Sequence, residues 1–308
     1  MLLKRDNRKT LRQLMEKGQV FTPIVWDCFT SYMAEIEGFE AILLSGGCLQ
    51  GNICGFPDIG LSTADDLIRM TQNICNYSDL PLVVDADDGY GESPLVAYRT
   101  ACRLVDAGAA AFTIEDTTGF RGINRWGNGS KPEQKSPVVD RDLWLAKVRA
   151  SVAACKGSDC LVVARTDSLI GYGMEEAVTR ANLANEAGAD MTMIIGQHTL
   201  EEAAYIAEHV EGELFYPDIT SKDGKPYMTL DQLKELGYGI VSCHFFEKAC
   251  IAGIHDFCKH FKQDLTTVYG DTFPIDLDPD CKCFVFQTNM YNDPWLLMEQ
   301  EFMTGSKK

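Results

Sequence analysis

The stretch LVVDADDGYGESPLVAYRTACRLVDAGAAAFTIED, residues 82–116, contains the pattern that decides the fold of this chain. It begins with a short apolar run, continues with apolar residues at helical spacing as far as Gly108, and closes with a second apolar run. A glycine in that place is the usual signal for the end of a helix. The order strand, helix, strand builds parallel sheets, and here each strand ends in carboxylates.

The same rhythm recurs along the chain, and Gly188 and Gly237 close two further helical stretches. The strand-like runs are apolar along their whole length and alternate with helical stretches, which predicts a parallel sheet covered by helices. An open doubly wound sheet would carry a GxGxxG loop after its first strand, and none is present, so a closed (β/α)8 TIM-type barrel of the α/β class is favoured. The eight runs cover residues 21–25, 41–45, 82–86, 110–115, 161–167, 191–195, 213–218 and 239–244.

Composition and charge narrow the class of protein. The chain has 308 residues, 45% of them hydrophobic, and a formal net charge of -17, which is typical of a soluble globular protein without nucleic-acid or membrane partners. No apolar segment approaches the roughly 18 to 20 residues needed to span a bilayer, and the start is too charged for a secretory signal. We therefore expect a cytoplasmic enzyme whose anionic substrate would meet a metal, arginines or backbone amides.

The cysteines and the end of the chain carry separate predictions. Twelve cysteines are dispersed through the sequence, which favours reduced thiols, and the spacing of Cys281 and Cys283 suits neither a zinc site nor a disulfide.

After residue 244 come a helical pattern, a tail rich in Asp and Pro, and the apolar segment PWLLMEQEF. We expect a barrel domain over residues 1–260 and an extension over 261–308 that packs on a neighbouring subunit of a dimer or tetramer.

Acidic residues gather at two neighbouring strand ends. Asp85 and Asp87 are two residues apart, so in an extended segment both side chains would project to the barrel axis and could bind Mg²⁺ or Mn²⁺. For DADDG by itself, an Asp-Gly turn with local capping is the alternative. Glu115 and Asp116 favour the metal, because so many neighbouring acids repel one another unless a cation shares them. Asp88 points the other way and is expected to be structural.

Other strand ends carry groups that can bind an anion or move a proton. Ser45, Gly46 and Gly47 offer a hydroxyl and unhindered amides to a carboxylate, although a plain tight turn is the alternative. Arg165 can stabilise negative charge on a substrate or can simply form a salt bridge with the acids. His244 is a candidate proton carrier or substrate donor, and a structural role is the alternative.

Five motifs, in their order along residues 8–255, resemble the isocitrate lyase and phosphoenolpyruvate mutase superfamily. They are SGG at 45–47, PDIGLST at 57–63, DADDGYG at 85–91, IED at 114–116 and ARTD at 164–167. The resemblance implies a Mg²⁺-dependent barrel that acts on 2-oxo and 2-hydroxy acids and exchanges its eighth helix with a neighbouring subunit. It also implies that the SGG segment binds the 2-oxo carboxylate and that Arg165 contacts the substrate. The implied metal ligands, direct or through water, are Asp58, Asp85, Asp87 and Glu115.

Differences between this chain and the motifs of the superfamily indicate which of its branches the chain resembles most. Isocitrate and methylisocitrate lyases carry a KKCGH or KRCGH loop after IED, whereas this loop, TTGFRGINRWGNGSKPEQKS, has no cysteine. Ile195 stands where those lyases have glutamate, and Asp218 where they have asparagine. The mutases have EDK where this chain has EDT, so the resemblance is closest to the oxaloacetate decarboxylase branch, whose histidine corresponds to His244. The loop 119–136 is the expected lid, with basic residues Arg121, Arg125 and Lys131.

The predicted reaction is cleavage of a carbon-carbon bond in a small 2-oxo dicarboxylate such as oxaloacetate, through a metal-stabilised enolate. Arg165 would stabilise the anion, His244 would supply a proton, and Trp26 and Asp218 would line the substrate site. One alternative is cleavage or rearrangement of a carbon-phosphorus bond, as in phosphonopyruvate. Another is a 2-methylisocitrate lyase-like reaction on a different 2-hydroxy or 2-oxo acid, and a third is a metabolite-binding barrel without catalysis.

Overall fold

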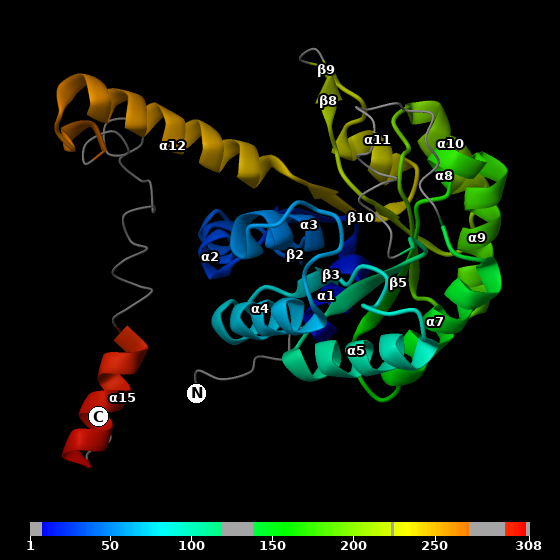
Figure 1. Ribbon diagram of the computed structural model, residues 1–308, viewed down its shortest axis with the longest axis horizontal. Coiled ribbons are helices and arrows are strands. Elements are labelled where there is room, and N and C mark those ends of the chain that lie inside the picture. The colour runs from blue at the N-terminus through cyan, green and yellow to red at the C-terminus, as the bar shows by residue number, and fades with distance from the viewer. Residues whose placement is uncertain (1–7, 119–137, 223–224, 271–292, 306–308) are drawn as a thin grey trace. The chain divides into compact units, whose positions relative to one another are not determined.

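The computed structural model describes residues 8–118, 138–222, 225–270 and 293–305 (Figure 1). The chain divides into two compact units, Lys4–His244 and Phe245–Lys308. The sequence boundary at residue 260 falls inside the helix that begins the second unit, and the assignment of 1–260 to the catalytic domain stays a prediction. The predicted lid residues and the pair Cys281 and Cys283 lie outside the described residues.

The first unit is a closed barrel of eight parallel strands, which confirms the predicted TIM-type fold. Its strands follow one another around the ring in the order β1, β10, β7, β6, β5, β4, β3, β2. A two-stranded sheet of β8 (Ser221–Lys222) and β9 (Lys225–Pro226) stands outside it. The barrel strands are β1 Val20–Val25, β2 Ile42–Leu44, β3 Leu82–Asp85, β4 Ala111–Glu115, β5 Leu161–Thr166, β6 Met191–Ile194, β7 Glu213–Tyr216 and β10 Tyr238–Cys243.

Helices cover the outside of the barrel, as seen for α4, α5, α7 and α9 in Figure 1. Their apolar faces pack on strands whose residues are nearly all buried, as the apolar runs predict. The predicted helix end at Gly108 is confirmed, since this residue has a φ of +100° that glycine adopts without strain. Among its described residues the helices are α1 Arg8–Lys17, α2 Cys28–Ile36, α3 Gly46–Cys48, the π-helix η1 Leu49–Cys54, α4 Ala64–Tyr77, α5 Pro94–Ala107, α7 Arg141–Ala154, α8 Leu169–Tyr172, α9 Met174–Glu186, α10 Leu200–His209 and α11 Leu230–Glu235.

Strand register brings polar side chains together at one end of the barrel. Asp85 on β3 pairs with Thr113 on β4, and Glu115 at the end of β4 pairs with Arg165 on β5. Because all eight strands are parallel, their carboxyl ends meet on one face, where TIM-barrel chemistry collects. The acids that lie 30 residues apart in sequence are thus neighbours across two adjacent strand ends.

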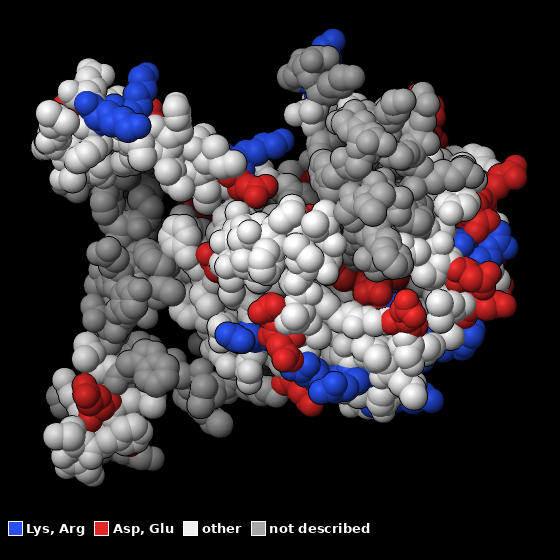
Figure 2. Space-filling model, in the orientation of Figure 1, with Lys and Arg blue, Asp and Glu red and all other residues white. Residues whose placement is uncertain are grey.

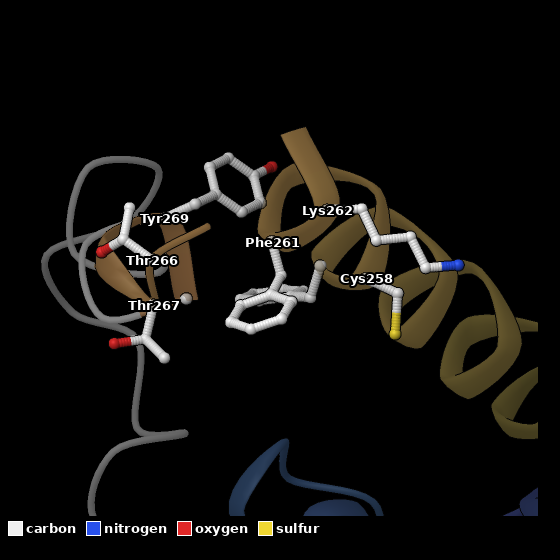
Figure 3. Close-up of a pocket in the computed structure, with 8 residues that line it drawn as sticks. Cys258, Phe261, Lys262, Thr266, Thr267 and Tyr269 are labelled. Atoms are coloured by element: carbon white, nitrogen blue, oxygen red, sulfur yellow. The ribbon is translucent and has the colours of Figure 1, made fainter. Parts of the chain in front are cut away.

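The second unit begins with α12 (Phe245–Asp264), and its described part ends with α15 (Asp293–Thr304). None of the described residues of α12 is buried, and Ile251 and Ile254 are 64% and 66% exposed. Close to the end of α12 is a pocket of about 460 Å³, shown in Figure 3, whose wall includes Phe261 from the helix and Tyr269 from the segment that follows it. Tyr269 donates a hydrogen bond to Asp256, at 2.6 Å, which ties that segment to the helix.

The charged surface and the free cysteines of the described residues agree with what the composition predicts. On the face of the barrel unit in Figure 2, acidic and basic side chains are interspersed, and no broad basic patch is visible among its described residues. In the parts of the chain that the structure describes, no helix has the length and apolar character needed to cross a membrane. The ten cysteines within those parts are all free, and four of them are buried.

Candidate active site

Three acids form a compact cluster at the carboxyl ends of β3 and β4. Asp85, Asp87 and Glu115 each offer one oxygen, and these oxygens lie within 4.8 Å of one another. Glu115 is completely buried and Asp87 is 4% exposed, so their charges are shielded little by water. Like charges this close disfavour one another unless a cation or a proton intervenes.

The backbone at Asp87 differs from the extended geometry that the sequence predicts. Strand β3 ends at Asp85, and Asp87 adopts a left-handed conformation with a φ of +51°. Aspartate tolerates this region better than most residues because its short side chain bonds locally. The Asp87 carbonyl accepts a hydrogen bond from the Glu115 N–H at 2.9 Å, which holds the turn against β4. The two aspartates converge because of this turn and not because of strand alternation.

Arg165 lies against the acid cluster from the end of β5. Its Nη1 is 3.0 Å from Glu115 Oε2 and 3.3 Å from Asp85 Oδ1, and its Nε and Nη2 bind both oxygens of Asp167 at 2.9 and 3.1 Å. Burial lowers the pKa of Arg165, but the carboxylates of Asp167, Asp85 and Asp87 outweigh it and raise the pKa above its ordinary value. The guanidinium is therefore a permanent positive charge beside the cluster.

The SGG segment faces the acids at very short range. The Gly46 N–H lies 3.4 Å from Asp85 Oδ2, and a Cβ on Gly46 would come within 3.1 Å of Asp87 Oδ1. A Cβ on Gly47 would come within 3.1 Å of Asp58 Oδ2. A side chain at either position would crowd these carboxylates, so the two glycines keep the space beside them open. Ser45 begins α3 as its N-cap and accepts a hydrogen bond from the Cys48 N–H at 3.2 Å.

Asp58 is positioned by Gln50, a residue that sequence reasoning missed. Gln50 is completely buried in η1, and its amide nitrogen lies 3.4 Å from Asp58 Oδ1. Its amide oxygen accepts hydrogen bonds from the N–H groups of Gly60 and Leu61, both at 3.1 Å. In the sequence Gln50 is one of two polar residues in the stretch CLQGNIC after SGG, and nothing there indicates that its side chain is buried against Asp58.

This donor set fits a divalent cation. The cluster supplies carboxylate oxygens, the type of ligand that Mg²⁺ and Mn²⁺ prefer, and two glycines leave room beside them. Asp85, Asp87 and Glu115 could bind the ion, and Asp58 lies beside Gly47 at the edge of the same space. The chemistry of the donor set does not distinguish Mg²⁺ from Mn²⁺.

His244 and Asp218 form a separate pair on another part of the rim. They follow β10 and β7, and β10 lies directly across the ring from β4, which carries Glu115. Asp218 Oδ2 is 3.1 Å from His244 Nδ1, and Asp218 Oδ1 accepts a hydrogen bond from the His244 backbone N–H at 3.1 Å. Both oxygens of Asp218 are thus engaged by His244.

With this geometry in view, comparison with known proteins assigns the family. The sequence model of the family described as phosphoenolpyruvate phosphomutase matches residues 11–261. The chain belongs to this family. It is an enzyme of the wider isocitrate lyase and phosphoenolpyruvate mutase superfamily, a lyase or mutase, as the sequence motifs predict.

Individual relatives carry several activities. A 2-methylisocitrate lyase of Aeropyrum pernix is 38% identical over 75% of this chain and 71% of its own length. An oxaloacetate decarboxylase of Paraburkholderia xenovorans is 36% identical over 66% of this chain and 66% of its own length. The structure of oxaloacetate acetylhydrolase in complex with the inhibitor 3,3-difluorooxalacetate superposes with a TM-score of 0.79, at 25% identity, over 98% of both chains.

Within this family member, two further acids have structural partners. Asp116 is completely buried and accepts hydrogen bonds from Thr166 Oγ1, the Asp167 N–H and Arg180 at 2.6, 2.9 and 3.1 Å. Burial is the main cause that raises its pKa to about 6. Asp88 lies 3.2 Å from Lys147, which is buried, as expected for a structural residue.

The remaining predicted residues lie at different places on the rim. Trp26 is 8% exposed at the end of β1, and its backbone N–H donates to Thr30 Oγ1 at 3.1 Å, so the strand end is tied to α2. Ile195 follows β6 and is half-buried. The structure brings together Gly46, Gly47, Asp58, Asp85, Asp87, Glu115 and Arg165.

His244 is expected to stay protonated through neutral pH. Burial lowers its pKa, but the hydrogen bond and charge of Asp218, with a smaller contribution from the nearby Cys48, outweigh this and raise the pKa to about 10. Because this exceeds the unfolded value of about 6.5, the contribution of His244 to stability is complete below about pH 6.5 and is lost as pH rises through about 10. A titration of its ring nitrogens by NMR should have a midpoint near 10 in the wild type and a lower one in Asp218→Asn. A wild-type midpoint between 6 and 7 would contradict this assignment.

Proposed function

We propose that this family member cleaves a carbon-carbon bond of a small 2-oxo dicarboxylate, in the manner of an oxaloacetate decarboxylase, with Mg²⁺ or Mn²⁺ bound. The observation that carries the proposal is the cluster of Asp85, Asp87 and Glu115, which faces the glycines of SGG and is flanked by Arg165. This arrangement suits an anion whose charge grows on an oxygen during bond cleavage. A cation bound there supplies Lewis acidity to a 2-oxo group and its neighbouring carboxylate.

The chain's own residues then have defined roles. The turn at Ser45, Gly46 and Gly47 binds and orients the substrate carboxylate in the space that the two glycines leave open. Loss of CO₂ leaves an enolate, and the permanent charge of Arg165 offsets the negative charge that develops on its oxygen. His244, on the β10 side of the rim, is the source of the proton that the enolate carbon takes up.

Two relatives support this class of substrate. The Paraburkholderia xenovorans relative is an oxaloacetate decarboxylase, and the solved acetylhydrolase is named for oxaloacetate and binds its difluoro analogue. Asp218 has both oxygens engaged by His244, so we propose that it acts through that histidine, although the sequence predicts a direct contact with substrate. Trp26 stays a proposed wall of the site.

A panel of acids assayed by product NMR tests the proposed function. Oxaloacetate should be consumed with Mg²⁺ or Mn²⁺ and give pyruvate and CO₂, and EDTA should stop the reaction. Turnover of phosphonopyruvate with oxaloacetate untouched would instead establish carbon-phosphorus chemistry. Turnover of 2-methylisocitrate alone would establish the lyase activity of the Aeropyrum pernix relative. If every acid binds and none is consumed, the chain is a metabolite-binding barrel and the proposal fails.

Two further proposals concern the surroundings of the site. We propose that the loop 119–136 acts as a lid and that its basic residues Arg121, Arg125 and Lys131 bind substrate carboxylates when it closes. We also propose a cytoplasmic location, which the free thiols of the described cysteines support.

We propose that the chain forms a homo-oligomer, a dimer or tetramer, in which the eighth helix of the barrel, α12, is exchanged between subunits. Support comes from the apolar side chains that α12 exposes, among them Ile254 and Phe261, which are 66% and 51% exposed. Light scattering after gel filtration should give a mass of two or four chains, and Ile254→Asp should reduce it. Lys259→Asp, which places a negative charge at another exposed position on α12 and changes the net charge by two units where Ile254→Asp changes it by one, should leave the mass unchanged. A monomeric wild type would refute the exchange.

A further inference from the structure

Lys147 on α7 is a buried lysine that the chemistry described above does not use. It is 1% exposed, and Trp144 and Val148 on the same face of the helix are completely buried. A lysine is almost never buried unless it is paired, so the groups that it binds indicate its role. Its Nζ donates to the Asp88 carbonyl at 2.9 Å and lies 3.2 Å from Asp88 Oδ2.

Asp88 belongs to a turn, residues 86–90, with an unfavourable backbone geometry. Asp87 and Tyr90 have φ angles of +51° and +63°, and they are two of the three residues other than glycine that have a positive φ in the described parts of the chain. The left-handed region is unfavourable for residues with a side chain, above all for a bulky one such as tyrosine. A backbone of this kind persists only where surrounding contacts hold it.

Lys147 supplies such contacts at the centre of the turn. The Tyr90 N–H donates to Asp88 Oδ1 at 2.9 Å, which is a bond within the turn. Lys147 binds the other oxygen of the same carboxylate and also the Asp88 carbonyl. Asp88 is therefore held at three atoms, and this fixes the direction of the chain at Asp87, the preceding residue.

The same helix holds the second strand end of the acid cluster. Trp144, one turn before Lys147 on α7, donates from Nε1 to the Ile114 carbonyl at 3.2 Å, directly before Glu115. The Glu115 N–H in turn donates to the Asp87 carbonyl at 2.9 Å. One helix thus contacts the residue beside Asp87 and the residue beside Glu115, so the separation of these two carboxylates depends on it.

We propose that Lys147 and Trp144 are positioning residues of the metal site, which hold Asp87 and Glu115 together from α7 so that a divalent cation meets a preformed set of ligands. Repulsion between the carboxylates favours an opened turn when no cation is bound, and the contacts from α7 oppose this opening. The proposal deepens the proposed function and rests on its metal site, not on the identity of the substrate.

The charge of Lys147 and its hydrogen bonds have opposite effects on a bound cation. A positive charge close to the cluster repels a divalent cation, so loss of the charge alone would strengthen binding. Loss of the hydrogen bonds frees the turn, and binding weakens because the cation must then order Asp87 itself. Lys147→Met keeps the apolar stem and removes the donors, so the direction of the change in Kd separates the two effects.

Mn²⁺ binding to the full-length protein without substrate tests the proposal, with free Mn²⁺ measured by its EPR signal. The Kd should rise by about tenfold or more in Lys147→Met, the usual effect of losing a residue that orients metal ligands. Arg149→Met removes the same charge from an exposed position on the same helix and should leave the Kd within about twofold of the wild type. An unchanged or lower Kd in folded Lys147→Met would overturn the proposal.

Trp144→Phe provides an independent test that changes no charge and keeps an aromatic ring in the core. It removes the donor to the Ile114 carbonyl, and the Kd for Mn²⁺ should rise by about threefold or more. If circular dichroism shows that Lys147→Met does not fold, this variant decides the question. A smaller rise in its Kd then overturns the proposal.

Hydrogen exchange in the metal-free protein determines whether the effect is local. Amides in a peptide covering residues 86–92 should exchange about tenfold or more faster in Lys147→Met than in the wild type. Amides of α9 should exchange at the wild-type rate. Equal acceleration in both regions would mean that Lys147 only stabilises the fold, and would overturn its role at the metal site.

The outcomes separate this proposal from the proposed function. If Mn²⁺ binds more weakly to both variants but the wild type consumes no 2-oxo acid, the positioning role stands and the lyase assignment falls. If oxaloacetate is consumed and both variants bind Mn²⁺ as the wild type does, the lyase assignment stands and the positioning role is wrong. A wild type that binds no Mn²⁺ would remove the metal site and the positioning role together.

Discussion

Replacing Asp87 by asparagine is expected to lower kcat/KM for the metal-dependent reaction by about 1000-fold, which corresponds to roughly 4 kcal/mol of transition-state stabilisation. Asparagine keeps the size of the side chain and tolerates the left-handed backbone at this position, so the change removes charge and little else. The loss follows because the neighbouring carboxylates, Asp85 and Glu115, retain the cation less tightly without the third charge.

The same substitution is expected to have no cost in stability when metal is absent. Asp87 lies within a cluster of buried acids, and removing one like charge relieves repulsion. Thermal unfolding in EDTA should therefore give an unchanged or higher Tm for Asp87→Asn, while the rise in Tm that Mg²⁺ produces in the wild type should disappear. Asp142→Asn, which removes the same charge from an exposed position at the start of α7, should keep both activity and the response to Mg²⁺. Normal activity in Asp87→Asn would contradict a metal role for the cluster.

Replacing Arg165 by methionine is expected to have the largest effect on stability. The guanidinium is within 3.3 Å of Asp85, Glu115 and Asp167, and its loss leaves buried carboxylates without their positive partner. Breaking a buried pair in this way costs about 3 to 5 kcal/mol, which lowers the Tm of a domain this large by about 10 °C. Calorimetry without metal measures this change, and saturating Mg²⁺ should restore part of the loss because a cation can share the same carboxylates.

Two variants sharpen that experiment. Arg103→Met breaks a surface pair with Asp65, whose side chain is 71% exposed, and should change stability by less than about 0.5 kcal/mol. Arg165→Lys keeps the charge but loses the fork that binds both oxygens of Asp167, so it should recover stability more than activity. If Arg165→Met unfolds at the same temperature as the wild type in EDTA, the carboxylates of Asp85, Glu115 and Asp167 do not depend on the charge of Arg165 in the metal-free protein, and the prediction is wrong.

The barrel was predictable because its signal is local and repeated. Each strand is a short apolar run and each covering helix has its own apolar face and ending, so the eight units are readable one by one. The acidic residues were predictable as a group for the same reason, since parallel strands bring their carboxyl ends to one face wherever they occur in the sequence. The backbone geometry at Asp87 was not predictable, because the same residues, DADDG, can form either a left-handed turn or an extended strand end.

The partners of the site residues were harder to predict. Gln50 has no strand-end position and no charge, and its buried side chain in η1 reaches Asp58 eight residues further along the chain. Asp218 was expected at the substrate, yet its oxygens lie against His244, 26 residues further along the chain.

The sequence by itself determined the kind of fold, the family and the presence of acids at the ends of the third and fourth strands, because these depend on local pattern and on motifs of consecutive residues. Only the tertiary structure decided which side chains touch. Ring closure sets β10 beside β7 and across from β4, so that His244 meets Asp218 while Arg165 meets the acids. Such contacts depend on the distances between loops that follow different strands, and periodicity along one strand carries no information about them.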